Sequence, residues 1–146
     1  MTVHLVKIAV GIESLEHLRE VQTERRKAAR VGGGNGRLRH MTRNRPRRSD
    51  EVLDGGCIHW IIKGYIRARQ RIVGLDEIVD GKGRKRCALI LSPKLERTEL
   101  VPHRPIQGWR YMEDDAAPRL ATGRNAKQVE ALPGPMADEL RSLGLL

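Results

Sequence analysis

The stretch Cys57–Val73 alternates apolar with basic side chains, and this two-residue period constrains the fold more than any other feature of the chain. Its even positions are mostly apolar, and its odd positions include a histidine, a lysine, a tyrosine and three arginines. Such alternation predicts a half-buried β-strand, although several isoleucines also fall at helical spacing and leave a helix as the alternative. Seventeen residues are long for one strand, so Gly64 is expected to mark a bulge, a bend or a break.

Further strands are expected on both sides of this stretch, from short apolar runs and from weaker alternation. They are Val3–Val10, Arg37–Arg43, Arg86–Leu91 and Ile106–Met112. Ser14 is a suitable N-cap for a helix that follows the first strand and ends at the glycine run 32–36. One early helix and irregularly spaced strands predict an α+β fold, with a small, strongly bent, mostly antiparallel sheet or a β-barrel.

The length of 146 residues fits one domain. Prolines recur and aromatic residues vanish beyond Glu113, so we expect residues 1–118 to form a single α+β domain. Residues 119–146 are then a peripheral tail with short helices. The chain has no apolar run near the roughly 20 residues of a membrane span. Its first residues lack a secretory layout, and its two cysteines cannot form a disulfide scaffold. We therefore expect a cytoplasmic protein that does not act at a membrane.

The positive charge of the chain is concentrated in one segment. Lysine and arginine number 28, and aspartate and glutamate number 18. Ten of the basic residues and no acidic residue lie between Arg25 and Arg48, so the rest of the chain is balanced at 18 against 18. Nine of the ten are arginine, whose planar fork suits phosphate. Such a segment predicts contact with a polyanion, and the alternative is a solvated basic loop.

All four aromatic residues lie in the strand-rich middle of the chain, among basic residues. Single-stranded nucleic acids are held by a basic groove together with aromatic faces on which bases stack, and RNA-binding modules use the same combination. We assign Trp60 to the core. We expect the chain to be a nucleic-acid-binding module that prefers RNA or a single strand, with RNA favoured over DNA. The expected contact residues are Arg37, Arg39, Arg43, Arg45, Arg47, Arg48, Lys63, Tyr65, Arg67, Arg69, Gln107, Trp109, Arg110 and Tyr111.

Two other functions remain open. The chain could be a protein-interaction or assembly factor whose basic segment docks on an acidic partner, or a small enzyme acting on nucleotides or nucleic acid. Cys57 and His59 look like a fragment of a metal or thiol site, and Asp80-Gly81-Lys82 like one of a nuclease. Neither fragment has the further ligands that such sites need. We therefore assign no catalytic residue, no metal and no cofactor.

Five segments look familiar in combination. They are His40–Arg48, Leu53–Gly64, Arg69–Ile72, Arg86–Leu91 and Gln107–Met112. Together they resemble an uncharacterised bacterial family known as domain of unknown function 1489, and the resemblance spans most of residues 1–118. The resemblance implies no activity, so it assigns no role to any residue. A weaker, fold-level similarity is to PUA-like barrels of the ASCH and EVE types. This similarity implies a PUA-like barrel and assigns no site. Several proteins of these types bind RNA or modified bases.

Overall fold

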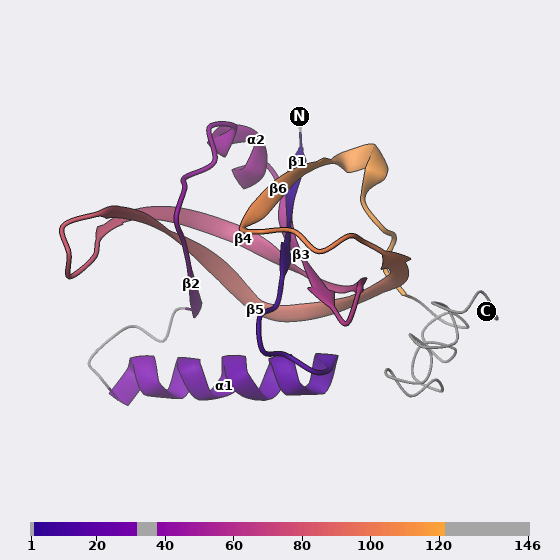
Figure 1. The fold of residues 1–146 in the computed structure, drawn as a ribbon, viewed down its shortest axis with the longest axis horizontal. Helices are drawn as coiled ribbons and strands as arrows, with labels where there is room; N and C mark the ends of the chain where they lie inside the picture. The colour runs from indigo at the N-terminus through magenta and orange to yellow at the C-terminus, as the bar shows by residue number, and fades with distance from the viewer. Residues whose placement is uncertain (1, 32–37, 122–146) are drawn as a thin grey trace.

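The computed structural model describes residues 2–31 and 38–121, which form one six-stranded sheet in the order β2-β5-β4-β3-β1-β6 (Figure 1). The strands are β1 (Val3–Ile8), β2 (Leu38–Thr42), β3 (Cys57–Ile62), β4 (Tyr65–Val79), β5 (Lys85–Pro102) and β6 (Trp109–Glu113). The helices are α1 (Leu15–Val31), α2 (Ser49–Leu53) and a short 3₁₀ turn, η1 (Asp114–Ala116). The early helix and the predicted strands are therefore confirmed.

The sheet is mixed and open. Only β1 and β3 pair in parallel, and the four other pairings are antiparallel. The long strands β4 and β5 carry register shifts at three places, the first of them between Ile66 and Ala68. Such bulges bend a sheet and increase its twist. Figure 1 shows β4 and β5 as one long curved hairpin. The prediction of a bent, mostly antiparallel sheet is confirmed, whereas the sheet does not close into a barrel, because β2 and β6 remain edge strands.

The break expected at Gly64 is confirmed. β3 ends at Ile62 and β4 begins at Tyr65, and the two strands pair as an antiparallel hairpin. The turn between them holds Lys63 at a φ of 53° and Gly64 at 82°. Glycine adopts such angles without steric cost, which explains why the alternating stretch turns back at this point. The strand interpretation of Cys57–Val73 is therefore correct, and the helical alternative is wrong.

The main core lies between one face of the sheet and α1. Its buried members include Leu5, Ile58 and Leu89 of the sheet and Leu18 of the helix. Trp60 belongs to this cluster and is buried, as predicted. The helix begins where the sequence suggested, because the Ser14 hydroxyl accepts a hydrogen bond from the His17 backbone N–H at 3.1 Å. A smaller apolar cluster covers the opposite face of the sheet.

A buried amide joins the helix to the sheet. Gln70 of β4 is fully buried and exchanges two hydrogen bonds of 2.7 Å with Gln22 of α1. Its oxygen also accepts a bond from Trp60 Nε1 at 2.9 Å, and its nitrogen donates to the Ser92 carbonyl at 3.1 Å. Both donors and both acceptor positions of the amide are thus used, and such a network fixes a single arrangement of the core.

Replacing this amide by an apolar side chain should destabilise the fold strongly. In Gln70→Leu the indole N–H of Trp60 and the amide of Gln22 lose their partners, and each buried orphan costs about 1–3 kcal/mol. We expect a loss of about 3–5 kcal/mol in the free energy of unfolding, measured by urea titration. The double variant Q22L/Q70L should recover part of the loss. A loss below about 1 kcal/mol in Q70L would contradict this account.

Two histidines, the fully buried His59 and the half-buried His40, are neutral in the folded protein. His59 is fully buried, packs edge-on against His4 with ring centroids 5.0 Å apart, and neither of its ring nitrogens has a hydrogen-bond partner among the described residues. Burial lowers the pKa of His59 to about 3 and that of His40 to about 4. Both rings therefore stay neutral in the folded protein well below the pH at which an unfolded chain takes up protons.

Stability should consequently fall as the solution is acidified below pH 6.5. The unfolded chain binds a proton at each histidine near its ordinary pKa of about 6.5, whereas the folded chain does not, so each group lowers the free energy of unfolding by up to about 1.4 kcal/mol per pH unit. Urea titrations between pH 7 and pH 4.5 should show this slope reduced by about 1.4 kcal/mol per unit in His59→Leu. If the free energy of unfolding of H59L and of the wild type changed equally with pH, the assignment of His59 as a neutral buried group would be refuted.

The last described residues run along β5. Leu120 forms an isolated antiparallel bridge with Thr98, and the Ala121 N–H donates to the Arg97 carbonyl at 3.0 Å. The rest of the predicted helical tail lies outside the described residues. Among the helices of residues 2–31 and 38–121, none has both the length and the apolar character needed to cross a membrane.

Candidate nucleic-acid interface

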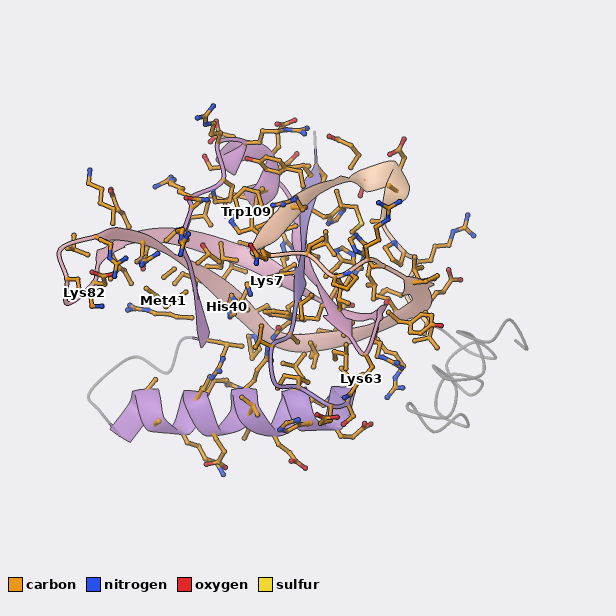
Figure 2. The ribbon with its side chains drawn as sticks, in the orientation of Figure 1. Lys7, His40, Met41, Lys63, Lys82 and Trp109 are labelled. Carbon is orange, nitrogen blue, oxygen red and sulfur yellow. The ribbon has the colours of Figure 1, made fainter. Side chains whose placement is uncertain are left out.

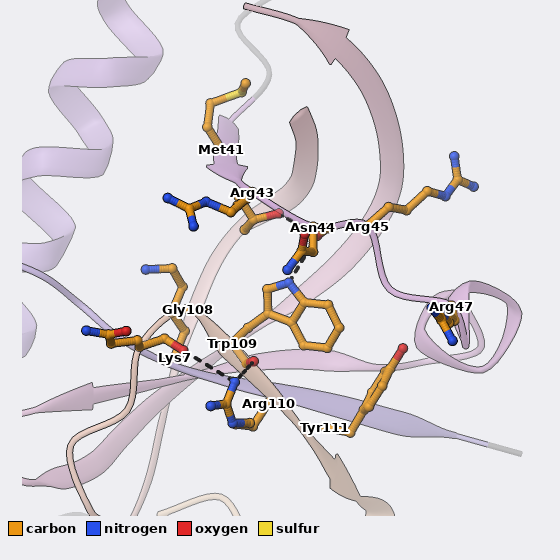
Figure 3. A pocket seen from close by; sticks show the side chains of 12 residues that line it. Lys7, Met41, Arg43, Asn44, Arg45, Arg47, Gly108, Trp109, Arg110 and Tyr111 are labelled. Atoms are coloured by element: carbon orange, nitrogen blue, oxygen red, sulfur yellow. Dashed lines mark hydrogen bonds between the residues drawn. The ribbon is translucent and has the colours of Figure 1, made fainter. Parts of the chain in front are cut away.

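A pocket of about 770 Å³ lies between the two edges of the sheet (Figure 3). One wall is the loop that follows β2, residues 43–47, and the other wall is formed by residues 107–111 at the start of β6. Lys7 of β1 lies between the walls. A volume of this size is within the range of sites that bind small molecules or single nucleotides.

Hydrogen bonds join the two walls. The Trp109 Nε1–H donates to the Asn44 carbonyl at 3.1 Å, and the Arg48 backbone N–H donates to the Tyr111 hydroxyl at 3.1 Å. These contacts span more than 60 positions of sequence. The loop and β6 therefore run side by side without forming a strand pair, and the pocket is the space that this arrangement leaves.

The Arg48 side chain helps to hold the two walls of the pocket together. Its guanidinium contacts Glu51 of α2 and Glu113 of β6, each at 2.6 Å. The hydrogen bonds from Arg48 hold the pKa of both carboxyl groups below their usual range, and the two carboxylates in turn raise the pKa of Arg48. A side chain engaged by two carboxylates is a poor phosphate contact, so Arg48 is better described as a clamp between α2 and β6.

The pocket itself is lined by cations and by no acidic residue. None of its cationic side chains forms an ion pair within residues 2–31 and 38–121. Basic residues elsewhere in the described chain do form ion pairs, for example Lys63 with Glu13 and Arg69 with Glu96. Within the part of the chain that the structure describes, Arg110 donates only to the carbonyls of Gln107 and Trp109. The positive charge of the pocket is therefore not neutralised by neighbouring side chains. The five cations are Lys7, Arg43, Arg45, Arg47 and Arg110.

Lys7 is the functional candidate that the sequence analysis missed. It pairs with Trp109 across the β1–β6 ladder and is half-buried, and burial lowers the pKa of its amine. Among the described residues, its Nζ donates only to the Ile8 carbonyl, at 3.5 Å. The signal was present, because Val3, Leu5 and Lys7 alternate with the same period and only the lysine breaks the apolar face.

Two aromatic rings stand between the cations. Trp109 and Tyr111 project from the same face of β6, with ring centroids 4.9 Å apart and planes at 71°. Figure 3 shows Lys7 and Arg43 toward the Trp109 end of the pocket and Arg47 toward the Tyr111 end. The pocket thus offers flat apolar surface flanked by positive charge on two sides, the combination that binds unpaired nucleotides.

Half of the fourteen predicted contact residues line this one pocket. They are Arg43, Arg45, Arg47, Gln107, Trp109, Arg110 and Tyr111. Arg39 lies on β2 outside it, with its guanidinium 4.0 Å from the Asp76 carboxylate. Arg37 falls outside the described residues.

The structure does not bring the β3–β4 residues to the pocket. Lys63 pairs with Glu13 at 2.7 Å, Arg69 lies 3.5 Å from Glu96, and Arg67 donates to the Ile62 carbonyl at 2.7 Å. Tyr65 is buried, with the Arg67 guanidinium 5.5 Å from its ring. Alternation predicted a common basic face for these residues, and burial along β4 does alternate from Ile66 to Val73. The face exists around Arg67 and Arg69, but it does not extend to the buried Tyr65, and it does not line the pocket.

Cys57 and His59 do not form a thiol–imidazole pair. The Cys57 backbone N–H donates to His4 Nδ1 at 3.0 Å, and this contact leaves His4 Nε2 to donate to Asp114 at 2.7 Å. Burial raises the pKa of the Cys57 thiol, which disfavours the thiolate. Within the described part of the chain, no three histidine, cysteine, aspartate or glutamate side chains are grouped as a metal site would require.

The comparisons with known proteins give a family and no function. No curated protein matches the chain, and no solved structure matches it. A family model does match residues 5–146, which is nearly the whole chain. The chain therefore belongs to the family described as protein of unknown function (DUF1489).

Proposed function

We propose that the protein binds single-stranded nucleic acid, with RNA preferred, in the pocket between the loop after β2 and β6. One observation carries this function: five cations that have no carboxylate partner among the described residues surround two aromatic rings in a pocket of about 770 Å³. Unpaired cations in a cleft attract a polyanion, and aromatic faces select unpaired bases within it. In this assignment the cations contact phosphates, Trp109 and Tyr111 contact bases, and the Gln107 amide reads a base edge.

Three further predictions bear on the proposal. The similarity to PUA-like barrels, several of which bind RNA, agrees with it and remains a prediction. A basic surface that docks on an acidic protein is the alternative reading of the same charge. We favour nucleic acid because an acidic peptide would leave the faces of Trp109 and Tyr111 without a stacking partner. The enzyme alternative has no specific observation in its support.

Removal of three pocket arginines should weaken binding and reduce its salt dependence. Five phosphate contacts to a single strand predict a slope of log K against log salt of about −3.5. The variant R43A/R45A/R47A removes three of them, so the slope should become shallower by about 2. Fluorescence anisotropy with a labelled RNA single strand across a salt series measures both quantities.

The matched control removes the same charge elsewhere. Arg19, Arg71 and Arg84 are exposed and lie outside the pocket, so R19A/R71A/R84A should keep a slope close to that of the wild type. Equal slopes for the two triple variants would show that the pocket is not the phosphate site. Binding that survives nuclease treatment in a pull-down would support the protein-docking alternative instead.

Trp109→Ala should weaken single strands more than duplexes and leave the salt slope unchanged. Stacking of one base on an aromatic side chain contributes about 1–3 kcal/mol, which corresponds to roughly a 5- to 150-fold loss in affinity for RNA single strands. Trp109→Phe keeps a flat ring and should retain most of the affinity, although it loses the bond to Asn44. An equal loss for single strand and duplex would contradict base stacking, and thermal melting would show whether W109A remains folded.

A further inference from the structure

The positive charge of the pocket ends abruptly beyond Tyr111. After Met112 the chain continues with three acidic residues, Glu113 to Asp115, and the first turn of α2 adds Asp50 and Glu51. Arg48 neutralises part of this group through its contacts with Glu51 and Glu113. Of these five carboxylates Glu51 and Glu113 pair with Arg48 and Asp114 pairs with His4, whereas Asp50 and Asp115 are exposed with no hydrogen bond or ion pair in the described part of the chain.

The opposite end of the pocket continues into more positive charge. A second cavity of about 130 Å³ lies between α1 and the neighbouring strands, and Lys7 borders both cavities. Arg25 of α1 and Arg39 of β2 line this second cavity, which has no acidic lining residue. Figure 2 places Lys7 and His40 between Trp109 and α1, so the cations form a continuous path from Tyr111 past Lys7 to the helix.

A bound strand meets opposite conditions at the two ends of this path. Toward α1, further phosphates find Lys7 and Arg25, and then Arg39, whose guanidinium lies at the 4.0 Å limit of an ion pair with Asp76. Beyond Tyr111, the next phosphate would lie among the carboxylates of α2, β6 and η1. Like charges repel, and the opposing charge of exposed acids acts over about 8 Å at physiological salt, which is longer than one nucleotide step.

We propose that the pocket binds the end of a strand, with the terminal nucleotide at Tyr111 and the remaining strand running over Lys7 toward Arg39 and Arg25. This inference rests on the nucleic-acid function given above and specifies which part of the nucleic acid the pocket takes. The acidic residues of α2, β6 and η1 act as a stop that excludes the interior of a continuous strand.

Circular oligonucleotides test the inference, because they present the same bases and phosphates without an end. We would compare an RNA single strand of about 20 nucleotides with its ligated circle, both labelled internally, by anisotropy at the same salt concentration. The linear strand should bind at least about tenfold more tightly than the circle. Blocking one terminus at a time with a bulky group then identifies which end enters the pocket.

Charge reversal at the acidic residues of the stop is the second test of the inference. In D50K/D115K two exposed carboxylates that have no partner within residues 2–31 and 38–121 become cations, so the fold should be unaffected and the circle should bind within about threefold of the linear strand. The control E20K/E77K makes the same change in net charge on α1 and β4. It should strengthen both ligands alike and keep their ratio.

The outcomes separate this inference from the function on which it rests. Equal affinity for the linear strand and the circle, with both lost in R43A/R45A/R47A, would overturn end binding and leave nucleic-acid binding intact. Failure of both ligands to bind wild-type protein would overturn both. A preference for the linear strand that D50K/D115K leaves unchanged would overturn the acidic stop as its cause.

Discussion

The buried amide pair of Gln22 and Gln70 fixes the position of α1, and the location of the pocket follows from it. Gln70 lies in β4, near the middle of the sheet, and its hydrogen bonds come from α1, β3 and the end of the apolar part of β5. A helix held in this way covers one end of the inner face (Figure 1). The other end is left to Lys7 and to the two edges of the sheet, where the pocket forms.

The open sheet leaves two edge strands, β2 and β6. Arg48 connects the loop after β2 to β6. Unpaired edges expose backbone groups and invite association with other strands. Here the loop after β2 crosses to β6, and Arg48 binds Tyr111 through its backbone and Glu113 through its side chain. The edges approach each other through side chains and not through a ladder. Space for a ligand therefore remains between them, which a closed barrel would not provide at this place.

The sequence was sufficient to predict most elements and about half of the site. Period-two alternation and the glycine at 64 located the β3–β4 hairpin, and Ser14 located the start of α1. It could not show which basic residues meet, because the fold brings Glu13 and Glu96 to Lys63 and Arg69. Ion pairs between distant segments depend on tertiary structure, and no local pattern reports them. The same reason explains why Arg48 looked like a phosphate contact.

The absence of carboxylates from the pocket is selective and not a consequence of composition. Acidic side chains stand directly beside it, yet Glu51 and Glu113 bind Arg48 and leave Arg45 and Arg47 without carboxylate partners among the described residues. Clustered like charges destabilise a folded protein, and local departures of this kind are typical of functional sites. A polyanion that enters the pocket relieves this repulsion in the folded chain only. Its binding must therefore also stabilise the fold, and the gain must shrink as added salt screens the cations.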